Sequence, residues 1–326
     1  KNIFFFFLCN LTNRFHFKKR RDTLFFGEIM ALYFKECEKK GYDGETLDTG
    51  YRWMYLGLKN ILPGPLKKLP KSFFFNNILK NVWINLGLVE DFKVDIEKDS
   101  VKIETWKEGI TEIVGENKFS VGCYKGIISA IYETQVKNKD YSQSKEHCTY
   151  QYKIEKTPCS LKAKPRKLYR KLNETRSPEG YKLKDAIKRG TFQLKQNNKL
   201  YFRGSVLYPV ESTILHIIGN KGILMERVPE ISYKYFKPLL KESSGKEKLV
   251  LLKTLLQTMG WGIVSIAKNE DSIKILIKNP PYGLQKEKDN WSFLGKMIEG
   301  YLWTLDKKIR MKKTQENYKM LTLLFK

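Results

Sequence analysis

The chain has 326 residues, of which 41% are hydrophobic and 13% aromatic; it can bury a real core and is not a disordered polymer. A formal net charge of +26, from 61 Lys and Arg against 35 Asp and Glu, favours polyanions or anionic surfaces as partners, although a lysine-rich solvated surface would give the same total. No apolar run approaches the ~20 residues that span a bilayer, and five scattered cysteines without a C-x-x-C pair argue against a disulfide framework or zinc knuckle and for a reducing, cytoplasmic location.

Residues 1–23 form an uncertain N-terminal tail. Their apolar run, Ile3–Cys9, precedes the basic Lys18–Arg21, whereas a signal peptide has its positive charge first and a longer apolar core. Two interpretations stay open. The segment is translated upstream sequence, with the natural start at or near Met30, or it is a basic and aromatic arm that docks on a partner.

The chain up to residue 86 is expected to be mainly helical. From residue 24 the apolar residues recur at roughly helical spacing, at Phe25, Ile29, Leu32 and Phe34. Glycines at 41 and 44 break the pattern, and a second helix is expected over 47–58. Prolines between 63 and 70 predict a loop. A helix over 73–86 then ends with Gly87 as its C-cap.

After Gly87 the apolar period changes to two. Alternation over 92–96 and 101–103 predicts an antiparallel hairpin, and Ile110–Val114 is expected to add a short strand. The segment 119–132 reads as a helix, in which Gly122 and Gly126 share one face and would let another backbone approach closely. A strand over 149–154 ends this unit.

Lys156–Arg203 is the most basic segment, with 15 Lys and Arg and three Asp and Glu. Segments 192–194 and 200–202 predict a hairpin through Asn197-Asn198. One interpretation is a nucleic-acid or phosphate-binding patch in which Tyr169, Tyr181 and Tyr201 stack on bases; the other is a solvated linker. The polyanion-binding candidates are Lys164, Arg166, Lys167, Arg170, Lys171 and Arg176.

The remaining residues predict a second set of similar elements. Helices are expected over 210–218, 233–240, 246–259 and 291–305, and strands over 262–266, 273–277, 309–311 and 320–325.

Two stretches show that the chain is an internal duplication. Residues 79–103 and 252–275 both open with Leu-Lys, carry a glycine eight positions later and close with Asp-Ser-Val/Ile-Lys-Ile. Phe119 and Gly126 are separated by the same seven positions as Phe293 and Gly300. The fold class is therefore expected to be α+β, with two copies of a unit of helices, antiparallel meander, helix and strand.

Four segments carry a resemblance to the 4-vinyl reductase domain. Phe293–Gly300 and Phe119–Gly126 resemble the opening of that family's last helix, His147–Ile154 its closing strand, and Tyr201–Pro209 its lead-in strand. Both copies are also similar to the small subunits of the TRAPP vesicle-tethering complex, which share that fold. The family's cysteine pair is incomplete: Cys148 has no cysteine just upstream, and the second copy has none at Thr322.

The resemblance implies a first domain over 24–156, a basic linker over 157–194 and a second domain over 195–326. It also implies domains that bind hydrocarbons or other small molecules, or that dimerise through their helices. Two fused copies could pack as an intramolecular pseudo-dimer.

The candidates for an apolar ligand pocket lie around the landmarks of the repeat; core packing is the alternative role for their aromatic members. They are Trp83, Phe119, Gly122, Gly126, Trp261, Phe293, Gly300 and Trp303.

No catalytic residue is predicted, because phosphate-loop, dinucleotide-binding and nucleophile-elbow motifs are absent from the sequence. No metal or nucleotide cofactor is indicated. His216 lies in an apolar pattern and is expected to be a packed or capping residue, and the adjacent His147 and Cys148 cannot close a tetrahedral metal site by themselves.

The favoured function is a non-enzymatic adaptor or regulator that binds a macromolecular partner and an apolar small molecule. The alternatives are a nucleic-acid or ribonucleoprotein-associated basic factor and, from the family resemblance, a reductase related to tetrapyrrole synthesis.

Overall fold

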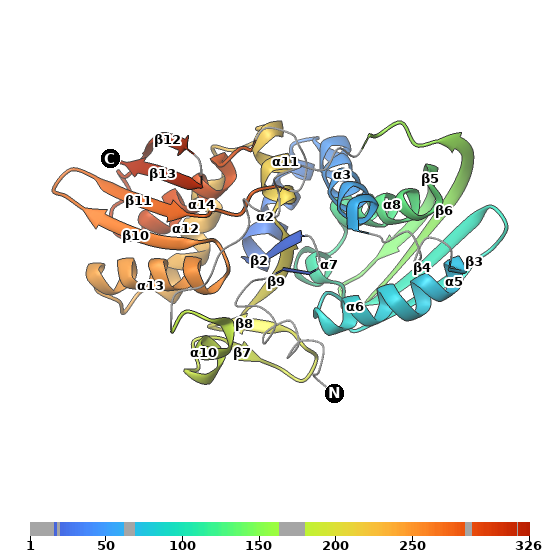
Figure 1. Ribbon diagram of the computed structural model, residues 1–326, viewed down its shortest axis with the longest axis horizontal. Helices are drawn as coiled ribbons and strands as arrows, with labels where there is room; N and C mark the ends of the chain where they lie inside the picture. The colour runs from blue at the N-terminus through green and yellow to red at the C-terminus, as the bar shows by residue number, and fades with distance from the viewer. Residues whose placement is uncertain (1–15, 18–19, 62–68, 163–179, 284–288, 318) are drawn as a thin grey trace.

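The computed structural model of the chain describes residues 16–17, 20–61, 69–162, 180–283, 289–317 and 319–326. Two antiparallel four-stranded sheets lie at opposite ends of the long axis, with a third sheet and several helices between them (Figure 1). The strands gather in antiparallel sheets and do not alternate with helices along the chain, so the predicted α+β class is confirmed.

The first half places its helices on one face of a sheet with the strand order β3-β4-β6-β5. Its strands bury alternate residues, as the period of two predicts. Its elements are α2 (Gly27–Lys39), α3 (Asp43–Ile61), α5 (Lys71–Phe73), the π-helical turn η1 (Phe74–Leu79), α6 (Lys80–Asn85), β3 (Asp91–Ile96), β4 (Ser100–Trp106), α7 (Gly109–Val114), α8 (Lys118–Tyr132), β5 (Thr134–Gln143) and β6 (His147–Pro158).

The second half repeats this sheet with the order β10-β11-β13-β12. The registers correspond: Ile103 of β4 pairs with Val94 and Tyr150, and Ile275 of β11 pairs with Ile266 and Leu323. The elements are α11 (Thr213–Lys221), α12 (Val228–Leu239), α13 (Gly245–Thr258), β10 (Ile263–Lys268), β11 (Ile273–Lys278), α14 (Ser292–Leu302), β12 (Met311–Asn317) and β13 (Met320–Phe325).

The central sheet joins the two halves. Its order is β1-β2-β9-β8-β7, formed by β1 (His16–Phe17), β2 (Arg20–Phe26), β9 (Ser205–Glu211), β8 (Leu200–Phe202) and β7 (Gln193–Leu194). In the antiparallel pair of β2 and β9, Asp22 lies opposite Glu211, Leu24 opposite Pro209 and Phe26 opposite Leu207.

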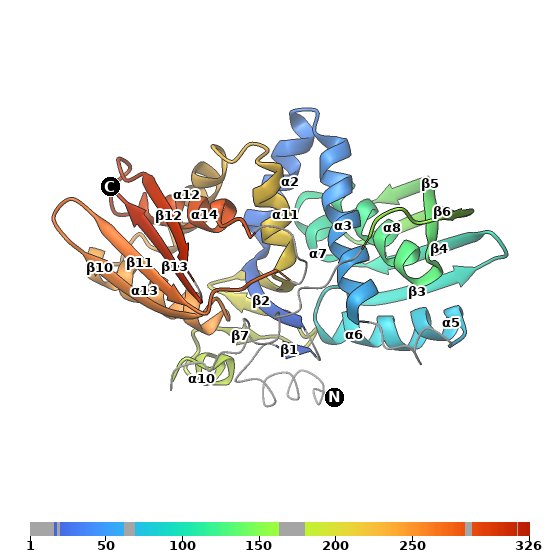
Figure 2. The same ribbon diagram turned by 45° about the horizontal axis from the view of Figure 1, so that its top comes forward.

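Each half also sends a helix across to the other. Helix α2 packs on α12 of the second half, and α11 packs on α3 of the first (Figure 2). Lys221 of α11 forms a 2.7 Å ion pair with Asp48 of α3, and Arg227 lies 3.6 Å from Glu36 of α2. Helices of both halves thus take part in the contact between them.

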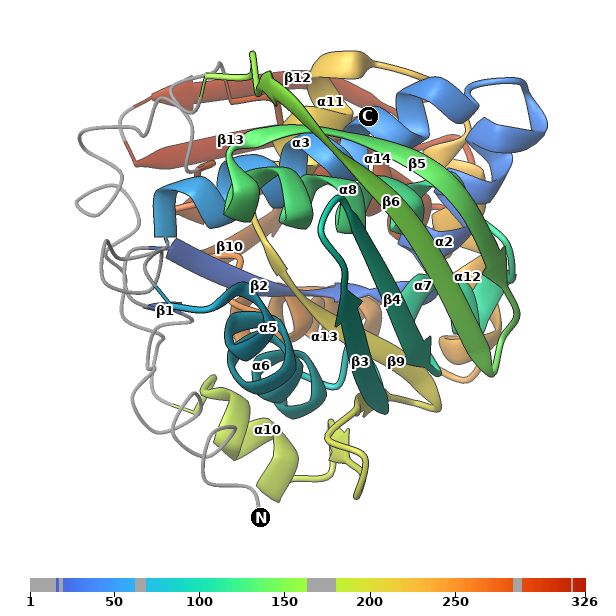
Figure 3. The same cartoon turned by 90° about the vertical axis from the view of Figure 1, so that its right-hand side faces the viewer.

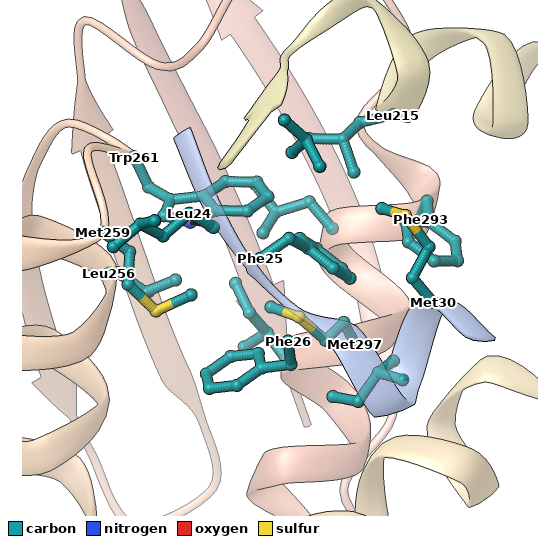
Figure 4. Packing of buried hydrophobic residues seen from close by; sticks show 14 of the residues in the cluster. Leu24, Phe25, Phe26, Met30, Leu215, Leu256, Met259, Trp261, Phe293 and Met297 are labelled. Atoms are coloured by element: carbon teal, nitrogen blue, oxygen red, sulfur yellow. Dashed lines mark hydrogen bonds between the residues drawn. The ribbon is translucent and has the colours of Figure 1, made fainter. Parts of the chain in front are cut away.

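Strand β2 runs through the apolar core of the second half (Figure 4). Leu24, Phe25 and Phe26 are at most 2% exposed. The Phe25 ring lies 5.6 Å from the Trp261 ring and 5.7 Å from that of Phe293. This largest cluster of buried residues continues into α2 and reaches Phe119 of α8, whereas the interior of the first sheet forms a second cluster.

Several elements differ from the sequence prediction, among them α7, β2, β9, β5 and α10 (Leu183–Lys188), and the strand expected over 309–311 is β12, which begins only at Met311. Ile110–Val114 is helix α7 and not a strand; Ile110 and Thr111 are buried, and the turn ends at Gly115 with φ +70°. Phe25 lies in strand β2 and not in a helix. It and its neighbours are all buried, so the sequence lacks the alternation of apolar and polar residues that marks a strand.

Strand β9 occupies the start of the helix expected over 210–218, so that helix begins at Thr213. Strand β5 was not predicted, because its seven residues after Val136 are mostly exposed and polar.

Candidate functional site

The glycines among the predicted pocket residues hold helices together. A Cβ added to Gly122 would lie 1.9 Å from the carbonyl oxygen of Leu47 in α3, and one added to Gly126 would lie 2.4 Å from that of Tyr51. In the second half, a Cβ on Gly300 of α14 would lie 2.2 Å from the carbonyl oxygen of Pro229 in α12. The predicted close approach of another backbone is confirmed, and the glycine surfaces contact protein backbone.

The aromatic pocket candidates are packed against protein groups. Trp83 of α6 lies beside Phe92 and Tyr124, on the helix-covered face of the first sheet. Phe119 stacks on Phe34 of α2 with ring centroids 4.1 Å apart. An apolar ligand at these positions would have to displace protein side chains.

The other three candidates lie in the second half. The Trp261 indole N–H donates to the carbonyl of Leu24 at 3.0 Å, and Phe293 is fully buried beside Phe25. Trp303 is partly exposed; its indole N–H donates to the Ile309 carbonyl at 2.7 Å, and the Arg310 guanidinium lies over its ring. All three therefore serve the packing of the second half.

The first half contains a buried polar site that the sequence analysis missed. The Glu108 carboxylate is 6% exposed and accepts hydrogen bonds from the hydroxyls of Thr105, Thr111, Tyr124 and Tyr150, at 2.9–3.0 Å. These donors come from β4, α7, α8 and β6, so one carboxylate connects the sheet to both helices. Four hydroxyl donors suit an ionised acceptor.

Burial and this carboxylate affect the two tyrosines. Loss of solvation, and then the charge of Glu108, raises the pKa of Tyr124 and of Tyr150 well above 10. Both phenols therefore stay protonated at neutral pH and remain donors to Glu108. Protein hydroxyls surround the Glu108 carboxylate, so the site acts as a structural bridge between the sheet and the helices.

His216 holds the segment before α14 against α11, as a packed residue. Its Nδ1 accepts the backbone N–H of Asn290 at 3.0 Å, so the other ring nitrogen, Nε2, carries the proton and donates to the Pro281 carbonyl at 3.0 Å. Asp289 Oδ1 lies 3.4 Å from that nitrogen. The prediction of a packed histidine is confirmed.

The four cysteines that the structure describes do not form one cluster. Cys37, Cys123 and Cys148 are buried, and the Cys159 sulfur lies 3.0 Å from the Tyr51 hydroxyl. Within the described ranges, no three His, Cys, Asp or Glu side chains are grouped so that they could hold a metal ion. No helix in those ranges is long and apolar enough to cross a membrane.

The six polyanion-binding candidates, Lys164, Arg166, Lys167, Arg170, Lys171 and Arg176, lie outside the described residues. The later part of the same basic segment is folded against the core. Leu183, Ala186 and Phe192 are buried, and α10 (Leu183–Lys188) lies below the central sheet in Figure 2.

Part of this segment is attached to the first half. The ammonium of Lys199 is buried and ion-paired with Glu112 of α7. Asn198 donates to the carbonyl of Ile84, and a Cβ on Gly87 would lie 2.8 Å from the Asn198 carbonyl oxygen. The corner at Gly87, which connects α6 to β3 within the first repeated stretch, is thus covered by the predicted hairpin of β7 and β8.

The exposed side of α10 forms a cationic hollow of about 450 Å³. Its six lining residues are Gly180, Lys182, Lys184, Asp185, Lys188 and Arg189. Lys184, Lys188 and Arg189 are exposed, and none of the three forms an ion pair with a carboxylate in the described part of the chain. The Asp185 carboxylate accepts the backbone N–H of Lys182 at 3.3 Å. Three exposed and unpaired cations thus lie together in the described part of the basic segment.

The sequence offered some signals for these sites. The composition of the basic segment indicated a cationic surface, although the four cations around the hollow were not singled out. Glu108 could not be found, because one glutamate between a strand and a short apolar segment carries no motif.

A scan against models of known protein families gave no match to this sequence, and a search of curated proteins gave no relative.

Proposed function

We propose that the chain is a non-enzymatic adaptor whose halves form an intramolecular pseudo-dimer that binds a macromolecular partner. The observation that carries the proposal is the pairing of Leu24 with Pro209 at the centre of β2 and β9. In a two-fold symmetric interface, equivalent strands run antiparallel and the central residue pairs with its own equivalent. Positions 22–26 and 207–211 follow that rule, since they begin five and six residues before the first helix of their respective halves.

The crossed helices support the same interpretation. The contacts of α2 with α12 and of α11 with α3 would be one repeated contact in a homodimer, as would the ion pairs Lys221–Asp48 and Arg227–Glu36. Because the two halves already occupy this surface on each other, the remaining surfaces are the ones open to a partner.

The oligomeric state tests the pseudo-dimer. Light scattering on the purified chain should give the 38.4 kDa mass of one chain at all concentrations. A homodimer that forms through β2 or α2 would overturn the proposal. Affinity capture from the native source, with and without nuclease, tests the adaptor role: a stoichiometric protein partner that survives nuclease supports it, and measurable substrate turnover contradicts it.

A second candidate, a nucleic-acid-associated factor, is favoured by the cationic hollow beside α10. Charge neutralisation of phosphates makes such binding strongly salt-dependent. We expect a single-stranded polynucleotide to bind at low salt, with at least a tenfold loss for Lys184→Glu combined with Lys188→Glu. The control is Lys93→Glu with Lys102→Glu, which changes the net charge equally where each lysine is ion-paired. Equal losses in both variants would contradict a site at α10.

Binding of an apolar small molecule stays a prediction. The contacts of Trp83, Phe119 and Trp261 give it no added support, because protein groups already cover these side chains. Native mass spectrometry of the purified protein tests it, and a clean apo mass with no uptake of fluorescent fatty acids would exclude it.

A further inference from the structure

The two repeated sheets differ on the faces that point away from their helices. In each sheet, alternate residues point outward, and the strand registers align them in rows across the sheet. Figure 3 shows the first sheet nearest the viewer, with α8 behind it. Because the two registers correspond, the same rows can be compared position by position, and the first sheet serves as an internal reference for the second.

The outer face of the first sheet is charged and internally compensated. Its three central rows contain the lysines 93 and 102 and four carboxylates, Asp91, Asp95, Glu104 and Asp140. Three of the carboxylates form ion pairs with lysines: Asp91 with Lys80, Asp95 with Lys93, and Glu104 with Lys102. This is an ordinary solvated face.

The outer face of the second sheet carries none of these acids at the corresponding positions. At the positions of Asp91, Asp95, Glu104 and Asp140 it carries Ile263, Ala267, Leu276 and Lys313. The three rows contain three lysines and no carboxylate. Row by row they are Ile263, Lys278, Met320 and Asn317; then Ser265, Leu276, Thr322 and Gln315; then Ala267, Lys274, Leu324 and Lys313.

The apolar residues of these rows lie outside the core. Leu276 and Leu324 are partly exposed and belong to none of the three buried clusters or their partly buried neighbours, and Met320 is 37% exposed. They lie on the two central strands, β11 and β13. Around them, Lys274, Lys278 and Lys313 are exposed, and none pairs with a carboxylate of the described residues. The acids Glu270 and Asp271 are in the turn beyond the rows.

We propose that this face, defined by Leu276, Leu324, Met320, Lys274, Lys278 and Lys313, binds an acidic amphipathic helix of a protein partner. A sheet with helices on one face can accept a helix on the other, which completes a third layer. The apolar stripe of the helix would cover the leucines and the methionine, and its flanking carboxylates would meet the lysines.

Charge and shape select this occupant. A basic rim around an apolar centre is complementary to a ligand with the opposite charge and an apolar stripe. A flat sheet does not present a protruding apolar element of the kind that enters the ~5–10 Å interfacial layer of a membrane. The first sheet of a second copy is a weaker match, because three of its four acids are already paired with lysines.

An acidic amphipathic helix is thus the class of partner that we infer for the adaptor, and this inference rests on the proposed adaptor function. The probe is a synthetic 18-residue peptide with leucines at helical spacing and glutamates elsewhere, labelled with fluorescein. Binding to the full chain is measured by fluorescence anisotropy and located by methyl NMR. We expect micromolar affinity, with shifts at the methyls of Leu276, Leu324 and Met320.

Two double variants separate this face from overall charge. Lys274→Glu with Lys278→Glu should weaken peptide binding at least tenfold, whereas Lys93→Glu with Lys102→Glu on the first sheet should change it less than twofold. Urea unfolding of both variants verifies that they fold. Equal losses would overturn the proposal, as would equal binding of a scrambled peptide with the same composition, or methyl shifts elsewhere.

The same samples test the two other possible occupants of this face, a membrane and a second copy of the chain. Binding to phosphatidylserine vesicles without binding to the peptide would overturn the proposal in favour of a membrane. Self-association that Lys274→Glu with Lys278→Glu abolishes, again without peptide binding, would overturn it in favour of a second copy. Neither result would change the capture of a native partner, so failure here is distinguishable from failure of the adaptor role.

Discussion

Leu24 and Pro209 face each other at a position of the β2–β9 pair where the backbone groups point away from the partner strand. The Leu24 N–H donates to the Met259 carbonyl at 2.9 Å, and its own carbonyl accepts the indole N–H of Trp261 at 3.0 Å. A proline has no N–H to donate, so it fits only where the ladder requires none. Strand β2 of the first half is thereby held to the second half on both of its edges, by β9 on one and by residues 259–261 on the other.

Removal of the Phe25 ring should be among the most costly single changes. Phe25→Ala removes a fully buried side chain that touches Trp261 and Phe293, and is expected to lower the free energy of unfolding by about 3–5 kcal/mol. The control, Phe73→Ala, removes a ring that is 46% exposed and should cost no more than about 1 kcal/mol. Urea denaturation measures both. A chain shortened to begin at Met30 lacks all of β2 and should lose its cooperative transition.

The contact between α3 and α8 leaves no room at Gly122 for even a methyl side chain. Gly122→Ala places a methyl group 1.9 Å from the Leu47 carbonyl oxygen, so the helices must separate, at an expected cost of about 2–3 kcal/mol. Gly44→Ala, at an exposed position in α3 with open space around it, should leave stability unchanged or raise it by up to about 1 kcal/mol. Thermal unfolding that ranks the two alanines in the opposite order would contradict this packing.

The Glu108 site should require a carboxylate. Glu108→Gln replaces an acceptor for four hydroxyls by an amide that brings donors of its own, and should destabilise the protein by about 2–3 kcal/mol. Glu97→Gln changes an exposed carboxylate bound to Ser100 and should cost less than about 0.5 kcal/mol. A glutamine variant as stable as the parent in urea would show that the cluster adds nothing.

The thiols should differ in reactivity with pH. Burial raises the pKa of Cys37 and of Cys148 to about 11, and that of Cys123 well above 9. The thiolate is the reactive form, so at pH 8 about one buried thiol in a thousand is ionised. In a Cys9→Ser variant, Ellman's reagent should label only Cys159 rapidly, and all four remaining cysteines after denaturation.

The same shifts set the direction of the pH effect on stability. A thiol with a raised pKa in the folded state stabilises fully below its unfolded pKa, near 9, and this contribution is lost as pH rises through about 11. The free energy of unfolding should therefore fall between pH 9 and 11. Equal labelling of Cys37 and Cys159 at pH 8 would contradict the buried environment.

Local patterns predicted much of each half. The alternation in β3, β4 and β11 is visible in the sequence because one face of each strand is solvated and the other buried. Gly122 and Gly126 were predicted correctly as a close helix contact, since their spacing places them on one face. The similarity between residues 79–103 and 252–275 indicates the duplicated unit from the sequence alone.

Tertiary contacts decided the rest. Phe25 belongs to a strand because its neighbours on both sides are buried by the other half, and no local window contains that partner. Helix α7 forms where Glu108, the residue before it, is held by Tyr150, 42 positions along the chain, and also accepts a hydrogen bond from Thr111 of the helix. The outer faces of the two sheets differ at positions where both sequences keep the alternation of a strand. Only the strand registers show which positions of the two sheets correspond.

The passage of β2 through the second half also has a consequence for synthesis. Thr23 and its partner Val210 are 187 positions apart. At ~5–20 residues per second, a ribosome needs roughly 10–40 seconds to produce the second strand after the first. During that interval Leu24, Phe25 and Phe26 have no place to pack. The nascent chain therefore exposes three large apolar side chains and is a natural client for a chaperone until translation is nearly finished.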